Sequence, residues 1–278
     1  MASEPFLSWP VERVVRESPI PLTVLPDPAA LYAEFAATLL AEIAEHNRRG
    51  EPLSIILPVG PRGQYPVLAE RSNREGISWR GVRIYQMDEY LDWEGRYVPY
   101  ADPLSFRRFL REFVESLDPA LRPPREHLHV PDPEQVNAIA AAMARHGPVA
   151  TCYGGLGIHG HVAFNEPVIA RLSRVTPEQF RESRTRVVPL APETLVMNSI
   201  RQLGGDTYAL PPMAVTIGMR EIRGAGRIRL YCDGGMWQRA VLRRALFEPA
   251  SVEWPVTLLR EHPDFRIVAT EETAQPAW

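Results

Sequence analysis

Two histidines and a carboxylate follow a run of glycines near the middle of the chain. The segment Gly154-Gly-Leu-Gly-Ile-His-Gly-His-Val-Ala-Phe-Asn-Glu-Pro167 places His159 and His161 two positions apart, with Glu166 five positions after the second histidine. Glycines let the backbone turn sharply or approach a ligand, and an imidazole exchanges protons near neutral pH. This pattern favours a catalytic loop over a glycine-rich loop with incidental histidines. The glycines that we expect to contact a substrate are Gly155, Gly157 and Gly160.

The same polar side chains are possible zinc ligands, because zinc binds imidazole and carboxylate groups. Two histidines that lie two positions apart on a loop are a weak metal motif, however. We therefore expect His159, His161 and Glu166 to work without a metal ion.

A pair of acidic residues follows another buried segment. Asp88 and Glu89 lie in Met87-Asp-Glu-Tyr90, directly after the apolar residues 82–86. A carboxylate at the end of a buried strand points into a crevice and can be desolvated enough to accept a proton. Acidic residues also cap helices and occupy solvated turns at such positions, so this motif alone does not establish catalysis.

All 31 basic residues of the chain are arginines, because the sequence contains no lysine. A guanidinium cannot form an imine, which excludes pyridoxal-phosphate enzymes and Schiff-base aldolases. The lysine-dependent phosphate loop of nucleotide hydrolases is excluded as well. The chemistry must therefore rely on carboxylates, imidazoles and arginines.

Short apolar runs alternate with amphipathic segments along the whole chain. Helices are expected at 27–50, 65–74, 103–115, 133–146, 193–202 and 236–247, and strands at 53–57, 82–86, 150–153, 186–189, 214–217, 227–232 and 265–269. This alternation predicts an α/β fold, with a mostly parallel central sheet and helices on both faces in three Rossmann-like layers. We see no internal boundary and expect one domain over residues 1–278. Ligands bind beyond the carboxyl ends of such strands, which directs attention to 58–63, 87–90 and 154–167.

Composition excludes several other classes of protein. A formal net charge of −3 on 278 residues does not provide the positive surface that nucleic-acid binding needs. No run approaches the ~20 apolar residues that span a membrane, and the N-terminus does not resemble a signal peptide, so we expect a cytoplasmic protein. Cys152 and Cys232 lie in apolar segments and are expected to be unpaired.

Residues 55–268 resemble the glucosamine-6-phosphate deaminase family, within a wider group that also holds the 6-phosphogluconolactonases. The resemblance rests on Met87-Asp-Glu-Tyr90 and on Gly160-His-Val-Ala-Phe-Asn-Glu-Pro167. It implies a small-molecule substrate, an amino sugar phosphate similar to glucosamine 6-phosphate. This substrate would be isomerised from aldose to ketose and would lose its amino group as ammonia, without any cofactor. It also suggests a homo-oligomer.

The resemblance implies a role for each polar residue of the two motifs. Asp88 would take a proton from C2 of the sugar and return it to C1. His161 would open the pyranose ring, and Glu166 would hold and tune that imidazole. His159 is a departure, since relatives carry an acid or an amide there. Our hypothesis is that His159 stays neutral and forms a hydrogen bond with the substrate or with His161.

The phosphate-binding residues depart from the family pattern more strongly. Relatives bind the phosphate with amides and hydroxyl groups after the first strand, whereas this chain has Pro61, without an amide hydrogen, and Arg62, a charged fork that suits an anion. The position of the family's phosphate-binding arginine aligns with Ile200, and Arg201 is next to it. The family's phosphate-binding lysine is absent, and Arg239 is its nearest replacement. The residues of these segments that we expect to contact the substrate are Gly60, Arg62, Gly63, Glu89, Arg201 and Arg239.

Extra residues after Pro167 lie where relatives have a lid, so we expect a reshaped lid over residues 168–205. Two alternatives stay open. One is a related isomerase or lactonase that acts on a different anionic sugar. The other is a sugar-phosphate sensor that binds without turnover.

Overall fold

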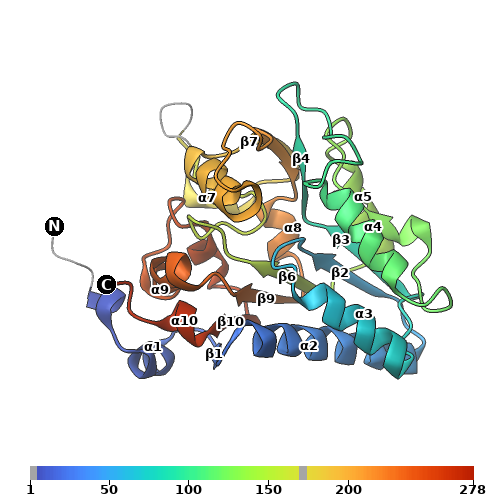
Figure 1. Ribbon diagram of the computed structural model, residues 1–278, viewed down its shortest axis with the longest axis horizontal. Coiled ribbons are helices and arrows are strands. Elements are labelled where there is room, and N and C mark those ends of the chain that lie inside the picture. The colour runs from blue at the N-terminus through green and yellow to red at the C-terminus, as the bar shows by residue number, and fades with distance from the viewer. Residues whose placement is uncertain (1–4, 169–173) are drawn as a thin grey trace.

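A parallel sheet of seven strands forms the centre of the molecule (Figure 1). The computed structural model describes residues 5–168 and 174–278. Every strand pairing in the large sheet is parallel. In spatial order the strands are β1 (Leu22–Leu25), β10 (Phe265–Thr270), β9 (Arg227–Cys232), β6 (Thr151–Gly155), β2 (Leu53–Leu57), β3 (Val82–Gln86) and β5 (Leu128–His129).

Helices cover both faces of this sheet, as the alternation predicts. Ile55 and Leu57 of β2 point into a core with α2 (Pro28–Arg49), α3 (Gln64–Glu75) and α4 (Phe106–Ser116). Ile56 points the other way, since successive strand residues face opposite sides. That second core contains residues of α1 (Val11–Glu17), α5 (Ala138–His146), α8 (Met219–Arg223) and α9 (Arg239–Phe247). The expected three-layer α/β fold is confirmed.

Helix α2 shows how local sequence sets an element. The Asp27 carboxylate accepts a hydrogen bond from the Ala30 amide at 2.8 Å, and Gly50 ends the helix with a φ of 67°. Its stripe of Leu31, Phe35 and Ile43 is fully buried, and each such side chain contributes about 1.5–3 kcal/mol. This helix has the bounds that the sequence predicts.

The structure also contains a second, antiparallel sheet, which the prediction of one mostly parallel sheet did not include. Strand β8 (Met213–Thr216) pairs with β4 (Asp88–Leu91) on one side and with β7 (Arg186–Pro189) on the other. The sheet has its own apolar cluster, which includes Tyr90 and Phe164. We expected these segments to end or to extend the parallel sheet. Residue periodicity identifies strands, but it does not show which sheet they join.

Smaller differences concern bounds and short elements. Helix α5 begins at Ala138 rather than at residue 133. The remaining elements are α6 (Pro177–Arg181), α7 (Pro192–Leu203), α10 (Glu271–Ala274), η1 (Pro5–Ser8), η2 (Arg125–His127), η3 (Gly235–Gln238) and η4 (Pro255–Leu259). Cys152 and Cys232 are buried and unpaired, as predicted. Within the described residues, no helix combines the length and apolar character of a membrane span.

The strand order creates a crevice between β2 and β6. From β2 the chain continues through β3 to β5 on one side, and it then returns to β6 on the other side of β2. Open α/β sheets bind ligands where the order reverses in this way, at the carboxyl ends of the strands. Of the expected lid, residues 169–173 lie outside the described residues, and the remainder contains α6, β7 and α7.

Candidate active site

A cavity of about 650 Å³ opens at the carboxyl ends of β2, β6 and β9. Its walls come from the loops that follow these strands, from the start of β4 and from one face of α7. Residues from each of these walls include Gly60, Asp88, Gly155, His161, Arg201 and Asp233. The three strand ends that the sequence indicates therefore meet at one cavity.

Asp88 is the first residue of β4 and lines this cavity. Its side chain is buried, and burial, followed by the charge of Glu89, raises the pKa of the Asp88 carboxyl to about 8. Desolvation disfavours the charged form of an acid. A carboxyl that titrates near neutral pH is suited to take up and return a proton.

His161 lines the same cavity from the loop after β6. Its ring packs against Gly157, where a Cβ atom would lie 1.7 Å from His161 Nε2. Because Nδ1 is buried and turned toward Glu166, which does not line the cavity, we infer that Nε2 is the nitrogen on the cavity side. Burial, followed by the charge of His159, lowers the pKa of His161 to about 3, so the imidazole is neutral.

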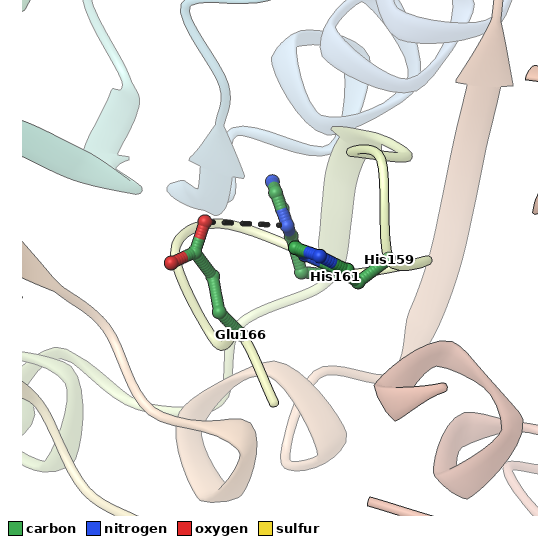
Figure 2. A group of neighbouring side chains, drawn as sticks. All are labelled: His159, His161 and Glu166. Carbon is green, nitrogen blue, oxygen red and sulfur yellow. Dashed lines mark ion pairs between the residues drawn. The ribbon is translucent and has the colours of Figure 1, made fainter. Parts of the chain in front are cut away.

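Glu166 lies behind His161 rather than on the cavity wall. Its Oε1 is 3.6 Å from His161 Nδ1 (Figure 2), and its Oε2 accepts a hydrogen bond from the Ala191 amide at 2.6 Å. Burial raises the pKa of Glu166 to about 7. This contact fits the expected role of Glu166 in holding the imidazole.

His159 also lies outside the cavity wall. Its Nε2 is 3.5 Å from Glu193 Oε2, while its ring centroid is 6.2 Å from that of His161. Burial lowers the pKa of His159, which favours the neutral form that we hypothesised. The partner differs from the hypothesis, since Glu193 rather than His161 contacts the ring. His159, His161 and Glu166 are also the described residues that could hold a metal ion.

Two arginines supply positive charge to the cavity. Arg62 lies over the Phe109 ring at 5.0 Å, and Arg201 lies over the Trp237 ring at 5.2 Å. Within the described part of the chain, neither forms an ion pair with a carboxylate. Burial lowers the pKa of Arg62, and Arg201 lowers it further, which indicates that the two guanidinium groups lie close enough to repel each other.

Helix α7 shows which of positions 200 and 201 faces the cavity. Arg201 faces the cavity, and so do Asn198, three positions before it, and Gln202, one position after it. Ile200, by contrast, is exposed. Asn198 Nδ2 donates a hydrogen bond to the Tyr90 hydroxyl at 3.1 Å. The 100° step between neighbouring helical residues makes Arg201 the cavity residue.

Four of the glycines that we expected to contact the substrate line the cavity: Gly60, Gly63, Gly155 and Gly157. A Cβ atom on Gly63 would lie 2.0 Å from the Tyr32 ring. The Tyr32 hydroxyl in turn donates a hydrogen bond to Asp233 Oδ2 at 2.7 Å. Sequence reasoning did not single out several lining residues, because local patterns do not show which side chains point into the cavity: Tyr32, Tyr90, Asn198, Gln202, Asp233 and Gln238.

Three expected contact residues do not line the cavity. Glu89 is fully buried and binds the start of α4, where its carboxylate accepts hydrogen bonds from the amides of Phe106 at 2.9 Å and Arg107 at 2.7 Å.

Arg239 is turned away from the cavity, and its Nε donates a hydrogen bond to the Glu272 carbonyl at 3.1 Å. Gly160 has a φ of 66° and serves the turn before His161.

Comparisons with known proteins identify relatives of this chain. No family model matches the chain. A curated glucosamine-6-phosphate deaminase of Parabacteroides distasonis is 30% identical over 258 residues, which cover 90% of this chain and 88% of that protein. A deaminase of Porphyromonas gingivalis W83 is 31% identical over 228 residues, with 80% of each chain covered.

Solved structures show the same fold. A monomeric glucosamine-6-phosphate deaminase aligns with a TM-score of 0.76 and 21% identity, covering 92% of this chain and 99% of that one. A 6-phosphogluconolactonase of Shewanella baltica aligns with a TM-score of 0.66 and 17% identity, covering 90% and 97%. The fold and the cavity define an enzyme of the doubly wound α/β class. More narrowly, the chain belongs to the glucosamine-6-phosphate deaminase family.

Proposed function

We propose that this protein isomerises and deaminates an amino sugar phosphate similar to glucosamine 6-phosphate, releasing ammonia and a ketose phosphate. The observation that carries the proposal is that Asp88 and His161, from different strand ends, line the same cavity as Arg62 and Arg201. Proton-transfer groups and anion-binding groups are thereby available to one bound molecule. The names of the curated relatives support the same reaction.

The arginines bind the phosphate in this proposal. Pro61 supplies no amide hydrogen to the loop after β2, and Arg62 from the same loop contributes a guanidinium instead. Arg201 approaches from α7. Guanidinium groups match phosphate oxygens with paired hydrogen bonds, and a dianion relieves the repulsion between two neighbouring cations.

Ring opening is the task of His161. The hydroxyl on C1 must lose a proton and the ring oxygen must gain one. A neutral imidazole whose Nε2 faces the cavity can accept the first proton and supply the second. Glu166, 3.6 Å from Nδ1, stabilises the imidazolium that forms in between.

Isomerisation is the task of Asp88. Its carboxylate removes the proton from C2, the electron pair forms a C1–C2 double bond, and the aldehyde oxygen takes a proton from water. The acid then returns its proton to C1, which leaves an iminium ion at C2, and this ion gives its extra proton back to become an imine. Water adds to this imine, the carbon–nitrogen bond breaks, and ammonia leaves with a ketose as the second product. Each well-placed acid or base of this kind contributes roughly 10²–10⁴-fold to the rate.

A second candidate is the same proton transfer on a differently substituted anionic sugar. Asp233 adds a carboxylate to the cavity, where it accepts a hydrogen bond from Tyr32, and the hydroxyl groups expected in the phosphate loop are missing. These residues would favour extra hydroxyl or amino groups on the substrate. A sensor without turnover is less favoured, because the proton-transfer residues are all present.

One panel of substrates tests these proposals. The protein is mixed with hexosamine 6-phosphates, hexose 6-phosphates and their unphosphorylated forms, and ammonia and ketose are measured together. Ammonia and ketose from a phosphorylated amino sugar are expected. Ketose without ammonia would identify a plain isomerase, and thermal stabilisation without either product would identify a sensor.

A further inference from the structure

Three donor groups converge immediately behind the cavity wall. One donor atom from each of His159, His161 and Glu166 can be chosen so that all lie within 4.8 Å of one another. Figure 2 shows the three side chains turned toward the same small region. The distance between His161 Nδ1 and Glu166 Oε1 is 3.6 Å. Neighbouring ligands of a tetrahedral zinc ion stand about 3.3 Å apart, so this pair needs little movement to bind one.

Each of the three side chains also has a buried atom that lacks a partner among the residues that the structure describes. His159 Nδ1, His161 Nδ1 and Glu166 Oε1 are buried and form no hydrogen bond with any of those residues. Buried polar atoms in native proteins nearly always have a partner, and leaving one without costs about 1–3 kcal/mol. A single cation between them would satisfy all three atoms.

Outer contacts engage the other polar atoms of His159 and Glu166. His159 turns its Nε2 toward Glu193 Oε2, 3.5 Å away, which leaves Nδ1 for a ligand. Glu166 uses Oε2 for the Ala191 amide, which leaves Oε1. Metal-bound histidines commonly hold a carboxylate with their second nitrogen in this way, and carboxylate ligands are themselves hydrogen-bonded.

We propose that His159, His161 and Glu166 form a binding site for a divalent ion of the zinc type, and that the bound ion inhibits the enzyme. Two imidazoles and one carboxylate are a ligand set that zinc uses with a fourth position open. His159 is the residue that completes the set, because without it one imidazole and one carboxylate remain.

Inhibition follows from the nitrogen that the ion occupies. An ion on Nδ1 of His161 fixes the proton on Nε2, the nitrogen on the cavity side. The ring can then donate from Nε2 but can no longer accept a proton there, and ring opening needs both steps. The ion also takes the Glu166 carboxylate away from its supporting role.

Metal binding is measured without turnover, so the metal site and the proposed function can fail separately, whereas the inhibition rests on the proposed function. Protein treated with a chelator and dialysed is titrated with ZnCl₂ in equilibrium dialysis, with zinc and protein quantified, and with CoCl₂ in a visible absorption titration. We expect one ion per chain and the intense visible band of low-coordinate Co²⁺. A wild-type protein that retains no zinc would overturn the site.

Variants assign the ligands. His159→Asn is expected to weaken binding by roughly 100-fold or more and to abolish the Co²⁺ band, and Glu193→Gln to weaken binding about 10-fold, as the loss of an outer contact does. His46→Asn, on α2, is the matched control and should bind like the wild type. Unchanged affinity in His159→Asn would contradict the ligand set.

Inhibition is tested by measuring ammonia release with and without zinc. Zinc that binds without slowing ammonia release, or whose effect is not reversed by a chelator, would contradict the inhibition.

Discussion

The imidazole of His161 packs directly against the backbone of Gly157 in the candidate active site. A Cβ atom on Gly157 would lie 1.7 Å from His161 Nε2, and the Gly157 amide donates a hydrogen bond to the His161 carbonyl at 3.0 Å. The loop after β6 therefore folds back on its own imidazole. Only glycine at position 157 leaves space for that ring.

Gly157→Ala is expected to lower kcat by about 100-fold, because displacing a reacting group by ~1 Å costs about that much. Ammonia release under saturating substrate measures the effect. Gly81→Ala is the control, since a Cβ there meets only the Glu51 carbonyl oxygen at 4.0 Å. Normal turnover in Gly157→Ala would show that the position of the ring does not matter.

Asp88→Asn is expected to abolish exchange of the C2 proton with solvent while leaving substrate binding nearly intact. An amide fills the same space but cannot accept the proton, so we expect a loss of roughly 10²-fold or more in rate. Exchange is followed by NMR in deuterated water, and binding by calorimetry. Exchange at the wild-type rate would remove Asp88 from its proposed role.

The raised pKa of Asp88, about 8, predicts two opposite pH effects. Activity needs the carboxylate, so kcat/KM should rise through neutral pH and level off above about 8. Stability should fall as the pH rises from about 4 to about 8. The unfolded carboxyl loses its proton near the ordinary value of 3.8, whereas the folded one keeps it until about 8, so rising pH favours the unfolded state between these values.

Asp88→Asn shows how much of the change in stability with pH comes from Asp88 alone. The amide does not titrate, so its Tm advantage over the wild type should grow from about pH 5 to about pH 8. Differential scanning calorimetry measures both proteins in the same buffers. A Tm difference that stays constant with pH would argue against a raised pKa at this site.

Glu89→Gln tests the structural role of the neighbouring acid. Glu89 pairs with Arg107 Nε at 3.0 Å and accepts two amide hydrogen bonds from the start of α4, so its loss should lower the free energy of unfolding by about 3 kcal/mol. Urea denaturation measures this. Glu115→Gln removes an exposed pair with Arg111 on the same helix and should cost less than about 0.5 kcal/mol. Equal effects would contradict the assignment.

Arg62→Ala and Arg201→Ala are each expected to raise KM for the phosphorylated substrate by about 10-fold or more, since a hydrogen bond to a charged group contributes roughly 1.5–3 kcal/mol. The unphosphorylated sugar should be affected much less. Arg239→Ala, whose side chain is turned away from the cavity, is the matched control. A larger effect in the control than in either cavity variant would show that the anion site is not at Arg62 and Arg201.

Local patterns predicted most elements of the fold. Residues 53–57, 82–86, 186–189 and 227–232 form strands with the expected bounds, and α2 is capped by Asp27 and ended by Gly50. These features depend on side chains close in sequence, so one chain suffices to find them. The antiparallel sheet of β4, β8 and β7 was not predicted, because the pairing of short strands depends on contacts between distant segments.

The candidate site likewise contains residues that the sequence indicated and residues that only the structure identified. The types and spacing of residues indicated Asp88, His161 and Glu166, and the absence of lysine excluded imine chemistry. Only the tertiary structure decided that Arg201 faces the cavity, that Glu89 and Arg239 do not line it, and that Tyr32 and Asp233 do. A sequence sets which groups are available, whereas the packing of helices against the sheet sets which way each one points.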